Sequence, residues 1–285
     1  MDRLSLGLHT FPSSGIVLTY TVKGTGPYLF IQAAGWGISS RYLQIGLAPL
    51  ESHFTLIYPE PRGSGASSRP ENEEEMSDAD MADDIERLRL HLGLTQIDLL
   101  GHSNGGTIVL IYAERYPNAL RRLIALTHWL PGYDDSATWK RFVDSRRNDP
   151  TYAEALQLME SQRPDTQDEW YQYLVGMLAF YVVDVSRHYP IFLEAMDVPS
   201  LWVNMAQRAA NEMKKIDVYQ ELKKIKARTL CLGCAEDPIC SENVSRVTAK
   251  GIAGADVVII EDCGHFPWIE KPEDFFKEVT KFIKS

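Results

Sequence analysis

Hydrophobic and polar residues alternate in two short stretches near the start of the chain, residues 4–11 and 16–22. Residues 12–15 between them read Pro-Ser-Ser-Gly, a composition that favours a tight turn, so the pattern predicts an antiparallel hairpin. From residue 28 the pattern changes, because continuous apolar runs of strand length now alternate with segments that carry apolar residues at helical spacing. This rhythm, without further hairpin signals, predicts a mostly parallel sheet covered on both faces.

The predicted strands after the hairpin are short and largely apolar: residues 28–33, 54–58, 97–100, 120–127, 228–233 and 257–260. The predicted helices that alternate with them lie at about residues 40–50, 78–92, 107–116, 241–251 and 272–283. Ser77 and Asp80 form a capping-box-like start for one helix, and Gly93 favours its end. Residues 66–76 are polar and acidic, as expected of a solvated loop. We expect an α/β fold whose sheet has about eight strands.

The rhythm of strand and helix is interrupted once. Residues 133–222 carry a helical pattern rich in Trp, Tyr and Phe, and four prolines divide it into about five helices: Pro150, Pro164, Pro190 and Pro199. Strand and helix alternate again afterwards, so the interruption does not end the fold. We predict a catalytic domain formed by residues 1–132 and 223–285, with residues 133–222 inserted as a helical cap.

Charge and composition narrow the classes of partner. The formal net charge is -10, and no cluster of Lys or Arg offsets it, so nucleic acid and an anionic membrane surface are not expected partners. No apolar run approaches the length of a membrane span or a signal peptide, which predicts a cytoplasmic protein. Cys231 and Cys234 have the spacing of a metal or redox pair. They lie in a predicted strand, where residues three apart face opposite sides, so no metal site is expected.

Residues 101–105 read Gly-His-Ser-Asn-Gly and match the pattern G-x-S-x-G, which places a serine on a sharp turn between a strand and a helix. The context fits, since an apolar strand precedes the motif and a helical pattern ending at Pro117 follows it. Glycine is needed around such a turn because neighbouring backbones approach closely, as Gly101, Gly105 and Gly106 would allow. Ser103 is therefore the candidate nucleophile.

A serine nucleophile needs a base and an acid that orients the base. His265 follows the last predicted strand, and Asp237 follows the strand before it, which gives the chain order Ser, acid, His. The carboxyl ends of parallel strands meet at one edge of a sheet, so all three residues are expected there. Asp237 is preferred to its neighbour Glu236 because it ends the loop before a proline. Further alternatives for the acid are Asp134 and Asp135.

The oxyanion of an acyl-transfer intermediate needs backbone donors. We expect the N–H of Asn104, which follows the nucleophile, and the N–H of Gly35 in the loop after the 28–33 strand, with Trp36 as the neighbouring possibility. Trp36 and His102 are the candidate substrate contacts, the indole forming an aromatic wall. No cofactor and no metal enter this chemistry.

Four segments carry a family resemblance: GHSNGG, the Glu-Asp-Pro loop around Asp237, PEPRGSGASSRP and CGHFPWIEKPEDF. Together they resemble the α/β-hydrolase fold with a helical cap, and the last two are most similar to the proline iminopeptidase branch (peptidase family S33). Two motifs depart from that branch. Its His-Gly-Gly-Pro-Gly loop is replaced by Ala-Ala-Gly-Trp-Gly at residues 33–37, and its Gly-Gly-Ser-Trp-Gly elbow by Gly-His-Ser-Asn-Gly.

The resemblance implies a cofactor-free serine hydrolase that cleaves a small ester, an amide or an N-terminal peptide bond beneath the cap, as a monomer or homodimer. Members that cleave N-terminal residues bind the substrate amine through cap carboxylates, a part that Glu169, Glu194 and Glu212 could play. Two other functions remain open: a biosynthetic enzyme catalysing cyclisation, C–C bond cleavage or acyl transfer, and a receptor for a small ligand.

Overall fold

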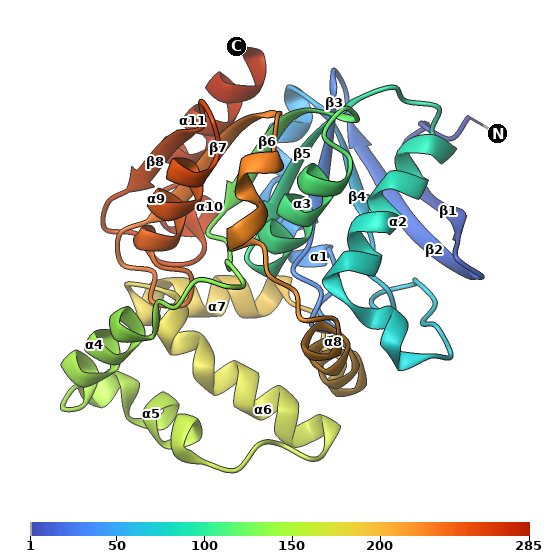
Figure 1. Ribbon diagram of the computed structural model, residues 1–285. Helices are drawn as coiled ribbons and strands as arrows, with labels where there is room; N and C mark the ends of the chain where they lie inside the picture. The colour runs from blue at the N-terminus through green and yellow to red at the C-terminus, as the bar shows by residue number, and fades with distance from the viewer. Residues whose placement is uncertain (1) are drawn as a thin grey trace.

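In a computed structural model that describes residues 2–285, eight strands form one sheet, and helices flank it (Figure 1). The order across the sheet is β1-β2-β4-β3-β5-β6-β7-β8. The strands are β1 (Gly7–Ser13), β2 (Ile16–Gly24), β3 (Tyr28–Gln32), β4 (Thr55–Pro59), β5 (Ile97–His102), β6 (Leu120–Leu126), β7 (Arg228–Cys234) and β8 (Asp256–Ile260). The mostly parallel α/β sheet expected from the sequence is confirmed.

Only β2 runs against the other strands. β1 and β2 form the predicted antiparallel hairpin, and β2 also pairs antiparallel with β4. The hairpin turns at Ser14 and Gly15, which have φ values of 48° and 83°. A two-residue turn with both residues at positive φ matches the twist of the strands that it joins. All other neighbouring strands are parallel, so their carboxyl ends gather at one edge of the sheet.

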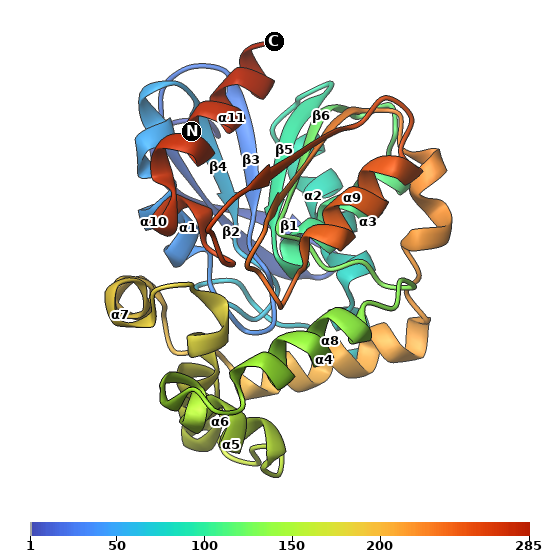
Figure 2. The same ribbon diagram turned by 90° about the vertical axis from the view of Figure 1, so that its left-hand side faces the viewer.

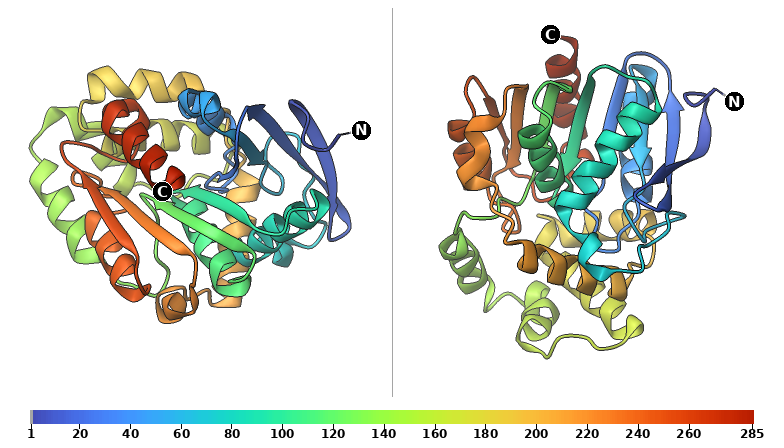
Figure 3. Two further views of the ribbon diagram at one scale, coloured as in Figure 1. Left: turned by 90° about the horizontal axis from the view of Figure 1, so that it is seen from above. Right: turned by 45° about the vertical axis from the view of Figure 1, so that its right-hand side comes forward.

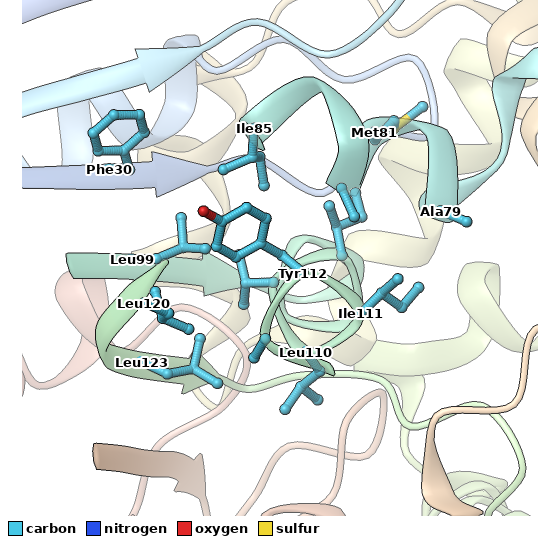
Figure 4. Packing of buried hydrophobic residues seen from close by; sticks show 14 of the residues in the cluster. Phe30, Ala79, Met81, Ile85, Leu99, Leu110, Ile111, Tyr112, Leu120 and Leu123 are labelled. Atoms are coloured by element: carbon cyan, nitrogen blue, oxygen red, sulfur yellow. The ribbon is translucent and has the colours of Figure 1, made fainter. Parts of the chain in front are cut away.

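Helices cover the two faces of the sheet in two groups, which Figure 2 shows on opposite sides. One group is α2 (Asp78–His91), α3 (Asn104–Arg115) and α9 (Glu242–Gly251). The other is α1 (Arg41–Gly46), α10 (Pro267–Glu270) and α11 (Pro272–Lys284). Each face has its own buried apolar cluster. In the first cluster, Tyr112 of α3 lies between Ile85 of α2 and Leu99 of β5 (Figure 4). The sheet is therefore packed on both faces, as its continuous apolar strands require.

Five α-helices lie between β6 and β7 in the sequence: α4 (Ser136–Arg146), α5 (Ala153–Glu160), α6 (Gln167–Met177), α7 (Val185–Ala195) and α8 (Leu201–Lys214). Short 3₁₀ segments accompany them: η3 (Pro150–Tyr152), η4 (Leu178–Tyr181) and η5 (Tyr219–Lys224). Figures 1 and 3 show α4 to α8 as a layer across one edge of the sheet. The chain then returns to the sheet through η5 and β7. The division of the chain into a catalytic domain and a cap stays a prediction.

Local predictions from proline and polarity were wrong in three places. The helix expected at 40–50 is split into α1 and the 3₁₀ segment η1 (Ala48–Ser52), because Pro49 offers no N–H and disfavours helix at the residue before it. Pro190 lies inside α7 instead of ending it, and the helix is held by Phe192, whose ring stacks on Phe266 at 3.9 Å. In the loop at 66–76, η2 (Glu73–Met76) buries Met76 completely.

Arg62 explains why that polar loop is ordered. Its guanidinium is almost completely buried, where Nε and Nη2 donate to the two carboxylate oxygens of Asp84 at 2.6 and 2.8 Å. Nη1 donates to the carbonyl oxygen of Glu75 at 2.6 Å. A buried pair with this bidentate geometry satisfies both charges. It fastens the loop after β4 to α2, on whose first residues the site described next depends.

Candidate active site

The turn between β5 and α3 holds Ser103 in a strained backbone conformation, with φ 57° and ψ −126°. Non-glycine residues adopt positive φ rarely, and the surrounding structure must hold them there. The flanking glycines make the turn possible. A Cβ on Gly101 would lie 2.2 Å from the carbonyl oxygen of Gly105, and one on Gly105 would lie 2.5 Å from that of Gln32. The sequence thus folds locally into the sharp strand-turn-helix that the motif predicts.

Asp237 and His265 are brought together from the ends of β7 and β8. Asp237 Oδ2 lies 2.7 Å from His265 Nδ1, and both side chains are almost fully buried, at 2% and 1% exposure. The other carboxylate oxygen, Oδ1, accepts the backbone N–H groups of Ile239 and Cys240 at 2.9 and 3.1 Å. Asp237 therefore holds a fixed orientation and accepts a hydrogen bond from Nδ1–H of His265, which leaves Nε2 of the neutral imidazole as an acceptor.

The alternative acids lie elsewhere. Glu236 is exposed, although it neighbours Asp237 in sequence. Asp135 accepts a hydrogen bond from the hydroxyl of Ser241, and Asp134 caps the start of α4 by accepting from the N–H of Ser136. Neither reaches the imidazole of His265. The geometry thus favours Asp237 as its partner.

Ser103 and His265 line the same cavity. Within residues 2–285, the hydroxyl of Ser103 forms no hydrogen bond to the imidazole. Catalytic hydrogen bonds are often loose before substrate binds. The backbone of His265 is fixed from two sides, since its N–H donates to Tyr181 of the η4 segment at 2.7 Å and its carbonyl accepts from His102 at 3.1 Å. The histidine is thus positioned by both the core and the helical segment between β6 and β7.

His102 lines the cavity, and both of its ring nitrogens are engaged within the protein. Nδ1 lies 2.9 Å from the hydroxyl of Tyr42, and Nε2 lies 3.1 Å from the carbonyl of His265. Because a carbonyl only accepts, Nε2 carries the proton and Nδ1 accepts from Tyr42. Burial holds the pKa of His102 well below its ordinary value, with the neighbouring His265 adding to the effect. His102 is therefore a neutral support for His265.

The turn after β3 comes beside the elbow because Gln32 pairs with Gly101 in neighbouring strands. Asn104 and Trp36 both line the cavity, whereas Gly35 is not on its wall. With φ at 72°, Gly35 turns against Gln207, so that a Cβ would lie 2.8 Å from the Gln207 side chain. The N–H of Trp36 donates to Gln207 Oε1 at 2.6 Å. The donors of the oxyanion hole stay a prediction.

A buried polar network that the sequence did not reveal lies behind this turn. Asp78, the first residue of α2, is 1% exposed. Its Oδ1 accepts from Asn104 Nδ2 at 2.9 Å and from Gln207 Nε2 at 2.7 Å, and its N–H donates to Asn211 at 2.8 Å. Burial raises the pKa of Asp78 from 3.8 to about 6, although these hydrogen bonds oppose the rise. The sequence signal at this helix start, Ser77 with Asp80, reports only capping.

We expect Asp78→Asn to change how stability depends on pH. Between about pH 4 and 6 the folded protein holds a proton on Asp78 that the unfolded chain has released, since its pKa rises from 3.8 to about 6 on folding. Ionisation of Asp78 thus lowers the free energy of unfolding by roughly 3 kcal/mol above pH 6. At pH 4.5 the folded protein regains about 2 kcal/mol of this stability, because Asp78 is protonated there. Urea unfolding at pH 4.5 and 7.5 should show the variant gaining about 2 kcal/mol on the wild type at the higher pH. An equal difference at both pH values would contradict the assignment.

The cavity that contains Ser103 has a volume of about 350 Å³ and a largely aromatic wall. Its large apolar side chains include Trp36, Trp129, Trp170, Tyr173, Tyr181 and Phe192. No Asp or Glu of residues 2–285 lines it, and Arg208 contributes its only Arg or Lys side chain. A groove of about 820 Å³ adjoins it, shares Trp36 and Arg208, and contains the carboxylates of Asp78, Asp165 and Glu212.

The three cap carboxylates that could have bound a substrate amine do not line the cavity of Ser103. Glu169 forms the capping box of α6 by accepting the N–H groups of Asp165 and Thr166, and it is exposed. Glu194 is exposed on α7 and lines neither the cavity nor the groove. Glu212 lines the outer groove only. The chamber around Ser103 is apolar with a positive edge.

Comparison with known proteins identifies the family to which this chain belongs. The family model described as alpha/beta hydrolase fold matches residues 29–272, which is most of the chain. The chain belongs to the α/β-hydrolase fold family. Among its members, the pyrrolizixenacetamide deacetylase of Xenorhabdus hominickii is 23% identical over 94% of this chain and 95% of its own length. The proline iminopeptidase of Lactobacillus crispatus is 23% identical over 90% of this chain and 89% of its own.

Solved structures of the family share the fold. The enol-lactonase from Burkholderia xenovorans superposes with a TM-score of 0.73 at 18% identity, covering 97% of this chain and all of its own. A thermophilic esterase from Thermogutta terrifontis gives 0.73 at 22% identity, covering 98% and 97%. The resemblance to the proline iminopeptidase branch is confirmed. The hydrolase fold and the relatives named as hydrolases, esterases and peptidases support an enzyme.

Other features of the chain bear on metals and membranes. The four cysteines are buried and free, and Cys231 and Cys234 both lie in β7. Within residues 2–285 no group of three or more His, Cys, Asp or Glu side chains is arranged to hold a metal ion. None of the helices described combines the length and the apolar character needed to cross a membrane.

Proposed function

We propose that this α/β-hydrolase is a serine hydrolase that cleaves a small ester or amide through an acyl-enzyme on Ser103. The observation that carries the proposal is the buried 2.7 Å contact between Asp237 and His265, whose imidazole lines the same cavity as a serine on a strained elbow. A buried carboxylate that accepts Nδ1–H keeps Nε2 free to take a proton. Relatives named as a deacetylase and an iminopeptidase support acyl transfer from nitrogen.

The mechanism follows from these contacts. Ser103 Oγ attacks the carbonyl carbon while its proton passes to His265 Nε2, and Asp237 stabilises the imidazolium that forms. The backbone N–H of Asn104, at the start of α3, donates to the oxyanion of the tetrahedral intermediate, where the helix N-terminus also favours negative charge. His265 then gives its proton to the leaving group. Water, activated by the same histidine, hydrolyses the acyl-enzyme.

The cavity wall suggests the kind of acyl group. An aromatic chamber of about 350 Å³ favours a compact apolar or aromatic acyl group by burying its surface. A protonated amine beside Ser103 would meet no carboxylate and would face Arg208 at the edge. An unpaired charge in such a site loses its hydration without compensation. The substrate is thus a neutral or acylated compound, not the free N-terminus of a peptide.

A matched pair of substrates tests this choice. We expect N-acetyl-alanine p-nitroanilide to be cleaved with a kcat/KM higher than that of alanine p-nitroanilide by about 10-fold or more, because an unsatisfied buried polar group costs about 1–3 kcal/mol and an unpaired charge costs more. The two compounds have the same leaving group and differ mainly in the charge of the amine. Short-chain and benzoic p-nitrophenyl esters serve as positive controls. Faster cleavage of the free amine would contradict the substrate assignment while leaving the nucleophile untouched.

A further inference from the structure

The helix α8 meets the sheet-bearing part of the protein at the turn that follows β3. The N–H of Ser200, the N-cap residue of α8, donates to the carbonyl of Gly37 at 3.0 Å. About two turns along the helix, Gln207 Oε1 accepts the N–H of Trp36 at 2.6 Å. Two peptide groups of this turn, one on each side of the peptide that joins Trp36 to Gly37, are therefore held by one helix.

Gln207 also reaches the residue beside the nucleophile. It is completely buried, and its Nε2 donates to Asp78 Oδ1, which in turn accepts from Asn104 Nδ2 at 2.9 Å. Asn104 Nδ2 also donates to the carbonyl of Ala34 at 3.0 Å. The carboxamide of Gln207 thus connects the turn after β3 with the start of α3 through a single carboxylate. Both segments border Ser103.

The turn needs such support because its backbone is strained. Gly35, Trp36 and Gly37 have consecutive φ values of 72°, 57° and 80°. Glycine adopts these values freely, whereas Trp36 carries a Cβ and a bulky ring, so the left-handed conformation costs it about 1–2 kcal/mol. A strained residue keeps its conformation when surrounding contacts over-determine it. The 2.6 Å bond to Gln207 holds the peptide group of the strained residue itself.

We propose that Gln207 is a positioning residue for catalysis, which holds the Trp36 turn and, through Asp78, the Asn104 amide in register with Ser103. This inference rests on the proposed serine-hydrolase function. It assigns to α8 an influence on the chemical step and not only on substrate binding, since Gln207 itself lines neither hollow. A displacement of about 1 Å in groups that surround a reacting carbonyl can lower the rate on the order of 10²-fold.

The test compares Gln207→Leu and Gln207→Glu with the wild type on a p-nitrophenyl ester. Leucine has a similar volume, but it removes the acceptor of the Trp36 N–H and one of the two side-chain donors to Asp78. Glutamate keeps an acceptor for Trp36 but loses the donor to Asp78 and adds a second carboxylate there. We expect kcat to fall by about 10- to 100-fold in both, with KM changed by less than about 3-fold. The rate of phosphonylation of Ser103 by a fluorophosphonate should fall in parallel.

Met213→Ala is the matched control, because Met213 lies on the same helix, is half-exposed and lines neither hollow. Its kcat should equal that of the wild type. Thermal unfolding identifies a Gln207 variant that fails to fold. The kinetics of the other Gln207 variant then test the proposal. Unchanged kcat, a rise in KM alone, or an increase in kcat would each overturn the proposal. Failure of the proposed function looks different, since the wild type itself would then neither react with the fluorophosphonate at Ser103 nor hydrolyse the ester.

Discussion

Ser103→Ala abolishes covalent labelling by a fluorophosphonate and lowers ester hydrolysis by roughly 10⁴- to 10⁶-fold, if Ser103 is the nucleophile proposed. The physical reason is that the elbow presents this hydroxyl to the cavity that His265 lines, and alanine offers no atom that can attack a carbonyl. Intact-mass analysis should show one phosphonyl adduct on the wild type and none on the variant. Initial rates on a p-nitrophenyl ester give the kinetic loss.

Ser68→Ala is the control for this experiment, because Ser68 is an exposed serine of the loop after β4 and does not line the cavity. It should be labelled and turn over like the wild type. Alanine removes only the hydroxyl and can occupy the same backbone conformation, so the unfolding temperature of Ser103→Ala should remain close to that of the wild type. Persistent labelling of a folded Ser103→Ala protein would place the reactive residue elsewhere.

Asp237→Asn is expected to lower kcat on the order of 10⁴-fold with little change in KM, because it imposes the wrong tautomer on His265. The carboxylate oxygen Oδ1 accepts two backbone N–H groups, from Ile239 and Cys240. In the variant the amide oxygen must remain there, so the NH₂ group faces His265 Nδ1. Nδ1 then accepts a hydrogen bond instead of donating one, so Nε2 carries the ring hydrogen and cannot take the proton of Ser103.

Glu236→Gln is the matched control, since it makes the same change of charge at the adjacent residue. Glu236 is exposed, and only its backbone is tied to the site through the carbonyl of Cys263. Its activity should equal that of the wild type. Steady-state kinetics of both variants on one ester decide between the two acids that the sequence left in competition. A large loss in Glu236→Gln with normal activity in Asp237→Asn would reverse the assignment.

The sequence by itself determined the fold and predicted three candidate catalytic residues, because local patterns mark the strands, the helices and the turn at Ser103, and the order of the parallel strands points to the other two residues. Apolar runs of strand length and helical periodicity predicted the sheet and its flanking helices. The structure confirms these elements, because each one buries the apolar face that its sequence pattern predicts. Ser103 could be identified as a candidate because the close approach of backbones around the turn requires glycine, and these glycines form a recognisable sequence motif. Asp237 and His265 followed from a topological rule, that parallel strands end at one edge.

Tertiary structure decided what depends on contacts between distant segments. The sequence could not show that Gln207 holds Trp36 across 171 residues, or that Asp78 lies buried between Asn104 and Gln207. Pro190 in α7 was misread for the same reason, since packing on Phe266 outweighs its local preference. The chemistry of the cavity wall was equally hidden. The sequence of a helix does not show whether one of its glutamates, such as Glu212, faces a nucleophile or solvent. The packing of the helix against the rest of the protein decides this.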